Sequence, residues 1–143
     1  MKTIKKTDIS DCAICCVAML TGASKKELIA EYGIDETGGY KYWSVIRVIK
    51  TLASLGLSYG SVFTFTTKLT DDVADLRLTL DLLKYPALLT VETDLDILED
   101  VCHFVVWDNK ERMVRDPSNK VGELTSIEEY KVLEWAVVAP FNT

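Results

Sequence analysis

The residue types that could do chemistry in this chain are few and lie in two places. The segment SDCAICCVAML contains Cys12, Cys15 and Cys16, and Cys102 directly precedes His103, the only histidine. Thiols and imidazoles can bind zinc, a C-x-x-C pair can be redox active, and a thiol beside an imidazole can act as a nucleophile. The sequence therefore leaves three kinds of chemistry to compare.

A zinc site would have four ligands of acceptable type, namely Cys12, Cys15, Cys102 and His103. Two features disfavour it. The C-x-x-C pair opens an apolar helix instead of lying on a turn, and neighbours on a strand, such as Cys102 and His103, point to opposite faces. A redox-active C-x-x-C pair is disfavoured more strongly than the zinc site, because no βαβ unit surrounds the cysteines. We predict no metal and no cofactor, keep a zinc-binding protein as the weaker alternative, and interpret Cys15, Cys16 and Cys102 as apolar packing residues.

Cys12 differs from the other cysteines because it lies in the first turn of the predicted helix, where unpaired N–H groups and the helix dipole favour an anion. An ordinary thiol, with a pKa of ~8.5, is only a few per cent thiolate at neutral pH. Lowering the pKa of such a thiol to about 6 requires roughly 3.4 kcal/mol, whereas a helix end contributes ~0.3–1 kcal/mol. A protonated imidazole must supply the remainder, and His103 is the only candidate.

The strand that begins near His103 is predicted to form a hairpin with the strand that ends at Asp116. If the residues DNKE form its tip, Asp116 returns close to His103. A carboxylate in that position can accept the imidazole N–H and hold the orientation and charge of the ring. Cys12, His103 and Asp116 would then form the arrangement of nucleophilic thiol catalysis.

Helices precede strands in the predicted order of elements. The first half is predicted to form helices over 12–20, 24–33 and 44–56, of which the second opens with a capping box from Ser24 to Glu27. The second half is predicted to form a strand over 61–66, a helix over 71–84, strands over 87–91, 102–108 and 111–116, a short helix opened by the capping box SIEE (126–129), and a strand over 134–139. A tight turn at Asn109 and Lys110 joins the two strands of the hairpin. This order predicts an α+β fold in which N-terminal helices pack on a C-terminal, mostly antiparallel sheet.

The composition restricts the class of protein. A chain of 143 residues with 48% hydrophobic and 27% charged residues is typical of one soluble globular domain, 1–143. A net charge of -6 argues against general nucleic-acid binding. No apolar run approaches the ~20 residues of a membrane span, and the start MKTIKKTDIS lacks the apolar segment of a signal peptide. Together with the thiols, these features lead us to expect a cytoplasmic protein. Its oligomeric state is left open.

Five segments stand out over nearly the whole chain, namely DCAICCVAMLTGASKKEL, YPALLTV, HFVVWD, VRDPS and ELTSIEEYKVLEWAVVA. In this order they resemble a known family, the papain-like peptidases that remove double-glycine leaders from bacteriocins, and in particular its stand-alone members. The resemblance implies a papain-like fold and cleavage of a peptide or isopeptide bond in a peptide or protein substrate. It implies Cys12 as nucleophile, His103 as base and Asp116 as the orienting residue.

Two positions depart from the family pattern. Ala13 stands where a glycine usually follows the nucleophile, and Lys6 stands where a glutamine helps to hold the oxyanion. Lys6 is the oxyanion candidate of this chain because its ammonium group can donate hydrogen bonds. Loss of one oxyanion donor typically lowers the rate by ~10²–10³. The alternative function is therefore a weakened papain-like module that binds and sequesters a partner.

Overall fold

The computed structural model of the chain describes residues 1–5, 12–32, 45–59, 63–64, 76–92, 103–119 and 123–140. In chain order the elements are α1 (Cys12–Thr21), α2 (Lys25–Tyr32), α3 (Val45–Ser54), β1 (Leu57–Tyr59), β2 (Phe63–Thr64), β3 (Ala87–Val91), β4 (His103–Asp108), β5 (Met113–Arg115), the 3₁₀ turn η1 (Ile127–Glu129) and β6 (Val132–Pro140). Residues 76–81 add a helical segment before β3. Helices thus come first and strands second, as predicted.

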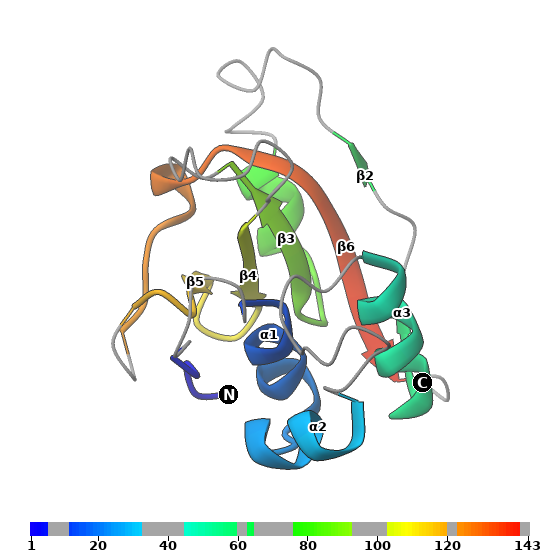
Figure 1. Ribbon diagram of the computed structural model, residues 1–143. Helices are drawn as coiled ribbons and strands as arrows, with labels where there is room; N and C mark the ends of the chain where they lie inside the picture. Colours follow the sequence, from blue (N-terminus) through cyan, green and yellow to red (C-terminus); the bar gives the residue numbers. More distant parts are fainter. Residues whose placement is uncertain are drawn as a thin grey trace.

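The strands form one antiparallel sheet with the order β1-β6-β3-β4-β5, and β2 also pairs with β6. β3 lies between β4 and β6, and all five of its residues are buried. The long strand β6 runs along the sheet. Helices α1 and α2 lie at the lower part of the sheet, and α3 lies beside the lower end of β6 (Figure 1). This is the predicted α+β arrangement of N-terminal helices on an antiparallel sheet.

The sheet separates two apolar cores because successive side chains of a strand point to opposite faces. One core joins α1, α2 and α3 to the sheet through residues such as Val17, Leu52, Leu88 and Val106. The other packs the helical segment 76–81 and η1 on the opposite face. Its members include Leu80, Leu89, Val105, Trp107, Ile127 and Trp135. The helix that begins at Cys12 is therefore fixed against one defined face of the sheet.

The three N-terminal helices follow their sequence signals closely. Every residue of α1 from Cys12 to Met19 is buried, as expected for a helix that is apolar on all sides. The backbone N–H of Glu27 donates to Ser24 Oγ at 3.1 Å, which is the predicted N-cap of α2. Gly56, after α3, has a φ of 80°, the left-handed conformation that glycine tolerates best at a helix end.

The second half departs from prediction at three places. β1 has no counterpart among the predicted strands. The hairpin between β4 and β5 closes through a four-residue loop, 109–112, with Arg112 at a φ of 56°, and so the predicted two-residue turn at Asn109 and Lys110 is wrong. Asp108 causes this difference, because its carboxylate accepts the N–H groups of Lys110 and Glu111 and its carbonyl accepts that of Arg112.

The predicted capping box at Ser126 is also wrong. Ser126 Oγ makes no capping hydrogen bond and donates instead to the carboxylate of Glu128, and the helix that follows is the single 3₁₀ turn η1. Parts of the predicted segments 61–66 and 71–84 lie outside the described residues. Among the residues that are described, no helix is long and apolar enough to cross a membrane.

Candidate active site

Packing places Cys12 at the start of α1. The helix contacts β4 directly, and its first residue is only 6% exposed. Cys15 and Cys16, one turn further along the same helix, are fully buried, in agreement with their interpretation as packing residues. Burial raises the pKa of Cys16 well above its ordinary value, and the neighbouring Cys12, Cys15 and Asp116 add to this effect. Cys16 is therefore held as a neutral thiol.

The register of the β4–β5 hairpin places His103 and Asp116 together. Val106 pairs with Arg115, and Trp107 pairs with Val114. Continuing this register by one residue puts Asp116 opposite Val105. His103 lies two residues before Val105 in the same strand, so its side chain points to the same face as the side chains of Val105 and Asp116. Diagonal neighbours on one face lie within reach of long side chains. The four-residue loop shifts the register by two residues from that of the predicted turn, so Asp116 lies diagonal to His103 and not directly opposite it. A shift of two residues keeps both side chains on the same face, which is why the two still meet.

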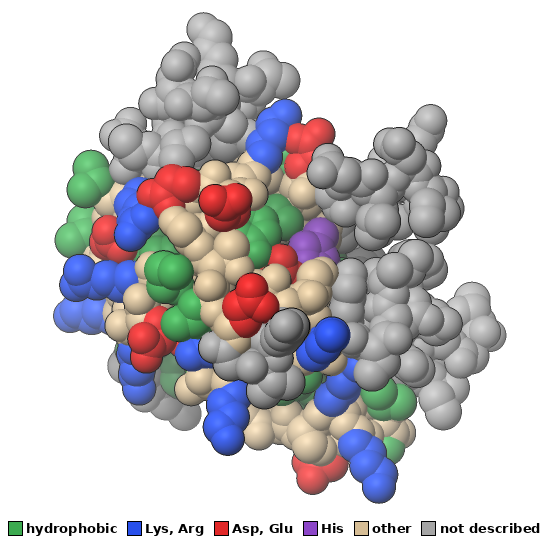
Figure 2. Space-filling view, turned by 90° about the vertical axis from the view of Figure 1, so that its left-hand side faces the viewer, with side chains coloured by type: hydrophobic (Ala, Val, Ile, Leu, Met, Phe, Trp, Pro, Cys, Tyr) green, Lys and Arg blue, Asp and Glu red, His purple; other side chains and the backbone are tan. Residues whose placement is uncertain are grey.

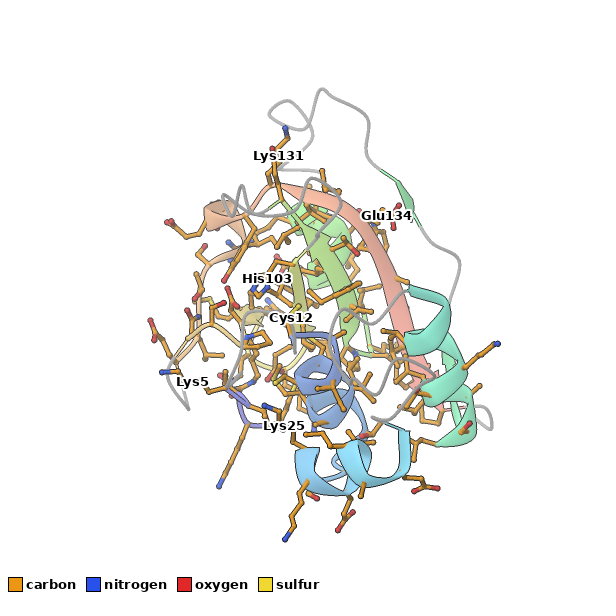
Figure 3. The ribbon with its side chains drawn as sticks, viewed as in Figure 1. Lys5, Cys12, Lys25, His103, Lys131 and Glu134 are labelled. Carbon is orange, nitrogen blue, oxygen red and sulfur yellow. The ribbon has the colours of Figure 1, made fainter. Side chains whose placement is uncertain are left out.

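The imidazole of His103 joins the other two predicted residues. Its Nε2 lies 2.6 Å from Asp116 Oδ1, and its ring is also hydrogen-bonded to the side chain of Cys12. Because Nε2 faces the carboxylate, Nδ1 is the ring nitrogen left for the thiol. Figure 3 shows His103 of β4 above the start of α1, where Cys12 lies. The site is thus a linear series of thiol, imidazole and carboxylate.

The charges of this series favour a protonated imidazole. Burial lowers the pKa of His103, but the hydrogen bonds with Asp116 and Cys12 outweigh it and raise the pKa to about 9. For Asp116 the effect of burial is to raise the pKa, yet the hydrogen bonds from His103, Tyr130 and Ser118 lower it to about 2. At neutral pH the pair is therefore an imidazolium and a carboxylate, so the ring can donate protons from both nitrogens.

The site is accessible from solvent. The side chain of His103 is 13% exposed. In Figure 2 it is purple and visible from outside, near apolar and acidic side chains. The ring of His103 therefore reaches solvent, whereas the side chains of Cys12 and Asp116 beside it are buried.

Two residues that the sequence did not single out contact the same carboxylate. The Ser118 N–H donates to Asp116 Oδ1 at 2.8 Å, and the Tyr130 hydroxyl donates to Oδ2 at 2.7 Å. Ser118 Oγ also lies 3.4 Å from His103 Nε2. Ser118 could have been found, since an aspartate commonly accepts the N–H two residues ahead in a turn. No local pattern marks Tyr130, because it reaches Asp116 only through the tertiary fold.

Other predicted residues cannot be placed. Lys6, the oxyanion candidate, and Cys102, the fourth residue of the zinc alternative, both lie outside the described residues. In the part of the chain that the structure describes, no three histidine, cysteine, aspartate or glutamate side chains gather in the manner of a metal site. The three residues that do meet are Cys12, His103 and Asp116.

The fold is that of papain-like peptidase domains. The chain is similar in structure to the peptidase domain of Streptococcus ComA, a bifunctional ABC transporter involved in a quorum-sensing pathway, with a TM-score of 0.58 and 18% identity over 97% of this chain and 98% of that one. It is also similar to a double-glycine-motif protease from an AMS/PCAT transporter, solved with the leader peptide, with a TM-score of 0.59 and 14% identity over 96% and 90% of the two chains. No protein-family model matches the sequence, and no curated protein matches it significantly.

Proposed function

We propose that the protein is a cysteine hydrolase that cleaves a peptide or isopeptide bond through Cys12, His103 and Asp116. The observation that carries this proposal is the position of the imidazole, hydrogen-bonded to the thiol on one side and to a buried carboxylate on the other. A thiol, an imidazole and an orienting carboxylate in series are the parts that nucleophilic catalysis requires. A reducing compartment such as the cytoplasm suits this proposal, because the nucleophile must be a reduced thiolate.

The reaction follows from these roles. The Cys12 thiolate, paired with the His103 imidazolium, attacks the carbonyl carbon of the scissile bond to give a tetrahedral intermediate. The imidazolium then protonates the departing amine nitrogen, the C–N bond breaks, and a thioester to Cys12 remains. In the second half, His103 accepts a proton from water, and the hydroxide attacks the thioester. The acid product leaves, and the Cys12 thiolate and the His103 imidazolium are restored. Asp116 keeps its negative charge and stabilises the imidazolium throughout.

The oxyanion that forms in each half requires hydrogen-bond donors. The first N–H groups of a helix have no partner within the helix, so the start of α1, at Cys12, is suited to bind a negative oxygen. Lys6 is the proposed side-chain donor. Its ammonium group would supply positive charge, although its long stem is less well ordered in advance than an amide side chain.

A trapping experiment tests the nucleophile. Purified protein is treated with iodoacetamide at pH 6, and the modified cysteine is identified by mass spectrometry. We expect Cys12 to react faster than a model thiol, because the imidazolium stabilises the thiolate at a pH where ordinary thiols are protonated. His103→Gln should remove most of this advantage. Cys16→Ala, a change in the same helix, serves as the matched control and should keep it.

A second experiment tests the reaction. The double-glycine protease among the structural neighbours was solved with a leader peptide, and so peptides containing Gly-Gly are the first substrates to try. We expect cleavage by the wild type, none by Cys12→Ala, and a thioester intermediate that hydroxylamine can intercept. A Cys12 that reacts no faster than a model thiol, with His103→Gln unchanged, would contradict the enzyme and favour the alternative, a peptide-binding module.

A further inference from the structure

We propose that Tyr130 is a positioning residue that fixes the plane of the Asp116 carboxylate, and through it the orientation of His103. This inference rests on the function proposed above and adds a residue to the machinery of the same site. It is carried by the hydrogen bonds around Asp116, which come from three separate segments of the chain.

The two oxygens of Asp116 are held by different groups. Oδ1 accepts the N–H of Ser118 at 2.8 Å and faces His103 Nε2 at 2.6 Å. Oδ2 accepts the hydroxyl of Tyr130 at 2.7 Å. A carboxylate that is held at one oxygen can still rotate about its last bond, whereas one held at both oxygens has a fixed plane. Tyr130 therefore directs Oδ1 toward the imidazole.

The direction of the phenol proton is itself determined. The side chains of Thr125 and Asn119 hydrogen-bond to Tyr130 and lower its pKa, which is the effect of donors to the phenol oxygen. Burial and the negative charge of Asp116 act more strongly and raise the pKa of Tyr130 well above its ordinary value. The phenol is therefore neutral, and because the Asp116 carboxylate carries no proton and can only accept, the phenol donates its proton to Oδ2.

The segment that carries Tyr130 is well anchored. Thr125 exchanges two backbone hydrogen bonds with Val114 of β5, at 2.8 and 2.9 Å. The N–H of Tyr130 donates to the carbonyl of Ile127 at 3.1 Å, and its ring packs against the core that contains Ile127 and Val132. Such an anchored hydroxyl can hold a partner group in place, because its own position varies little.

The test compares Tyr130→Phe with Tyr85→Phe. The first change removes only the hydroxyl and keeps the packed ring. Tyr85 lies just before Ala87, whereas His103 pairs with Val91 at the opposite end of β3, so Tyr85 is the matched control. We expect Tyr130→Phe to slow alkylation of Cys12 at pH 6 by about tenfold, the size of one hydrogen bond to a charged group. Tyr85→Phe should leave the rate unchanged.

A double-mutant cycle separates positioning from a structural role. If Tyr130 acts through Asp116, Tyr130→Phe should have no further effect on the rate in an Asp116→Ala background. An equal loss in both backgrounds, or a Tyr130→Phe protein as reactive as Tyr85→Phe, would overturn the proposal. Thr125→Val should produce a smaller loss of the same sign, because it releases the phenol without removing it.

Nuclear magnetic resonance gives a readout that does not depend on Cys12 reactivity. The chain has one histidine, and so the proton on His103 Nε2 gives one resonance. We expect this resonance to move upfield and to exchange faster with water in Tyr130→Phe, and to be unchanged in Tyr85→Phe. An unaltered resonance in Tyr130→Phe would refute the positioning role even if Asp116→Ala does not fold. The two proposals can fail separately. If Tyr130→Phe moves the resonance but Cys12 of the wild type is unreactive, the proposed enzymatic function is contradicted and the positioning role of Tyr130 is not.

Discussion

His103 is subject to opposing influences within a few ångströms. Burial favours the neutral ring, whereas Asp116 and Cys12 favour the charged ring. The combined effect of these two residues is larger than that of burial, and it raises the pKa of His103. The imidazolium is therefore a property of the folded arrangement, because an unfolded histidine has an ordinary pKa near 6.5. Any change that alters its neighbours should be visible in the titration of this one ring.

The stability of the protein should fall between about pH 6.5 and 9. The pKa of His103 is raised from 6.5 to about 9 by folding, so the stabilisation is complete below the unfolded value and is lost as the pH rises through the folded value. The loss in free energy of unfolding should be on the order of 3 kcal/mol. Urea denaturation at pH 6, 7.5 and 9.5 measures it. His103→Gln should flatten the profile over this interval, and an equally steep profile in that variant would assign the effect to other groups.

Asp116→Asn should lower the pKa of His103 from its value of about 9. The change removes the negative charge that stabilises the imidazolium and leaves burial, which favours the neutral ring. Titration of the single histidine by NMR measures the shift. Glu92→Gln, at an exposed carboxylate paired with Lys131, is the control and should leave the titration in place. A pKa near 9 in Asp116→Asn would mean that the charge of Asp116 is not what holds the proton.

Among the elements, the hairpin of β4 and β5 contributes most to the site, and it contains a buried ion pair. Arg115 Nε lies 2.7 Å from Asp108 Oδ2, with side chains 9% and 4% exposed. The same guanidinium donates to Thr3 Oγ1 at 3.1 Å, and Thr3 Oγ1 donates to the carbonyl of Glu123. Arg115 thus ties the N-terminal segment, which leads toward Lys6 and Cys12, to the strands that carry His103 and Asp116.

Arg115→Met should destabilise the protein by about 3–5 kcal/mol, because it leaves the buried carboxylate of Asp108 without its partner. Lys131→Met is the matched control, since it breaks an ion pair between side chains that are about half exposed, 52% and 53%. We expect that change to cost less than about 1 kcal/mol. Urea denaturation of both variants gives the comparison, and equal losses would show that burial does not determine the contribution of the pair.

The two serines predicted as helix caps should differ on substitution. Ser24 accepts the N–H of Glu27, whereas Ser126 makes no capping hydrogen bond. Ser24→Ala should therefore lower the free energy of unfolding by about 1 kcal/mol, and Ser126→Ala by clearly less. Thermal denaturation of the pair measures the difference. A larger loss for Ser126→Ala would mean that its hydrogen bond with Glu128 matters more than the geometry indicates.

At the scale of the whole molecule, we expect β3 to be the strand best protected from exchange with solvent. It pairs on both sides, with β4 and β6, and it is buried over its full length. Its amides should therefore exchange with deuterium most slowly, and those of the three-residue strand β5 faster. Hydrogen exchange followed by mass spectrometry measures both. Faster exchange in 87–91 than in 113–115 would indicate that the sheet opens from its centre.

The sequence predicted those parts of the fold whose signals are local. The apolar run from Cys12, the cap at Ser24 and the apolar strand ALLTV each correspond to an observed element. The presence of the hairpin could be inferred as well, because its two strands and the turn between them are adjacent in the sequence. Its register and the details of the turn could not, since they depend on which way the Asp108 carboxylate points.

The candidate site was predictable to a similar degree. Three residues were identified by type, and the structure brings them together, although their roles stay a prediction. Tyr130 could not be identified, because its contact with Asp116 arises from the return of the chain after β5 and not from a local pattern. The same holds for the anchoring of Thr3 by Arg115, residues separated by 112 positions.

The packing of α1 against β4 also has a temporal consequence. Cys12 is synthesised well before His103 and Asp116, which follow it in the chain after all three N-terminal helices. Under the proposed function, a polypeptide still emerging from the ribosome would thus carry an unactivated Cys12 thiol until the segment with His103 and Asp116 has been made and has folded against α1.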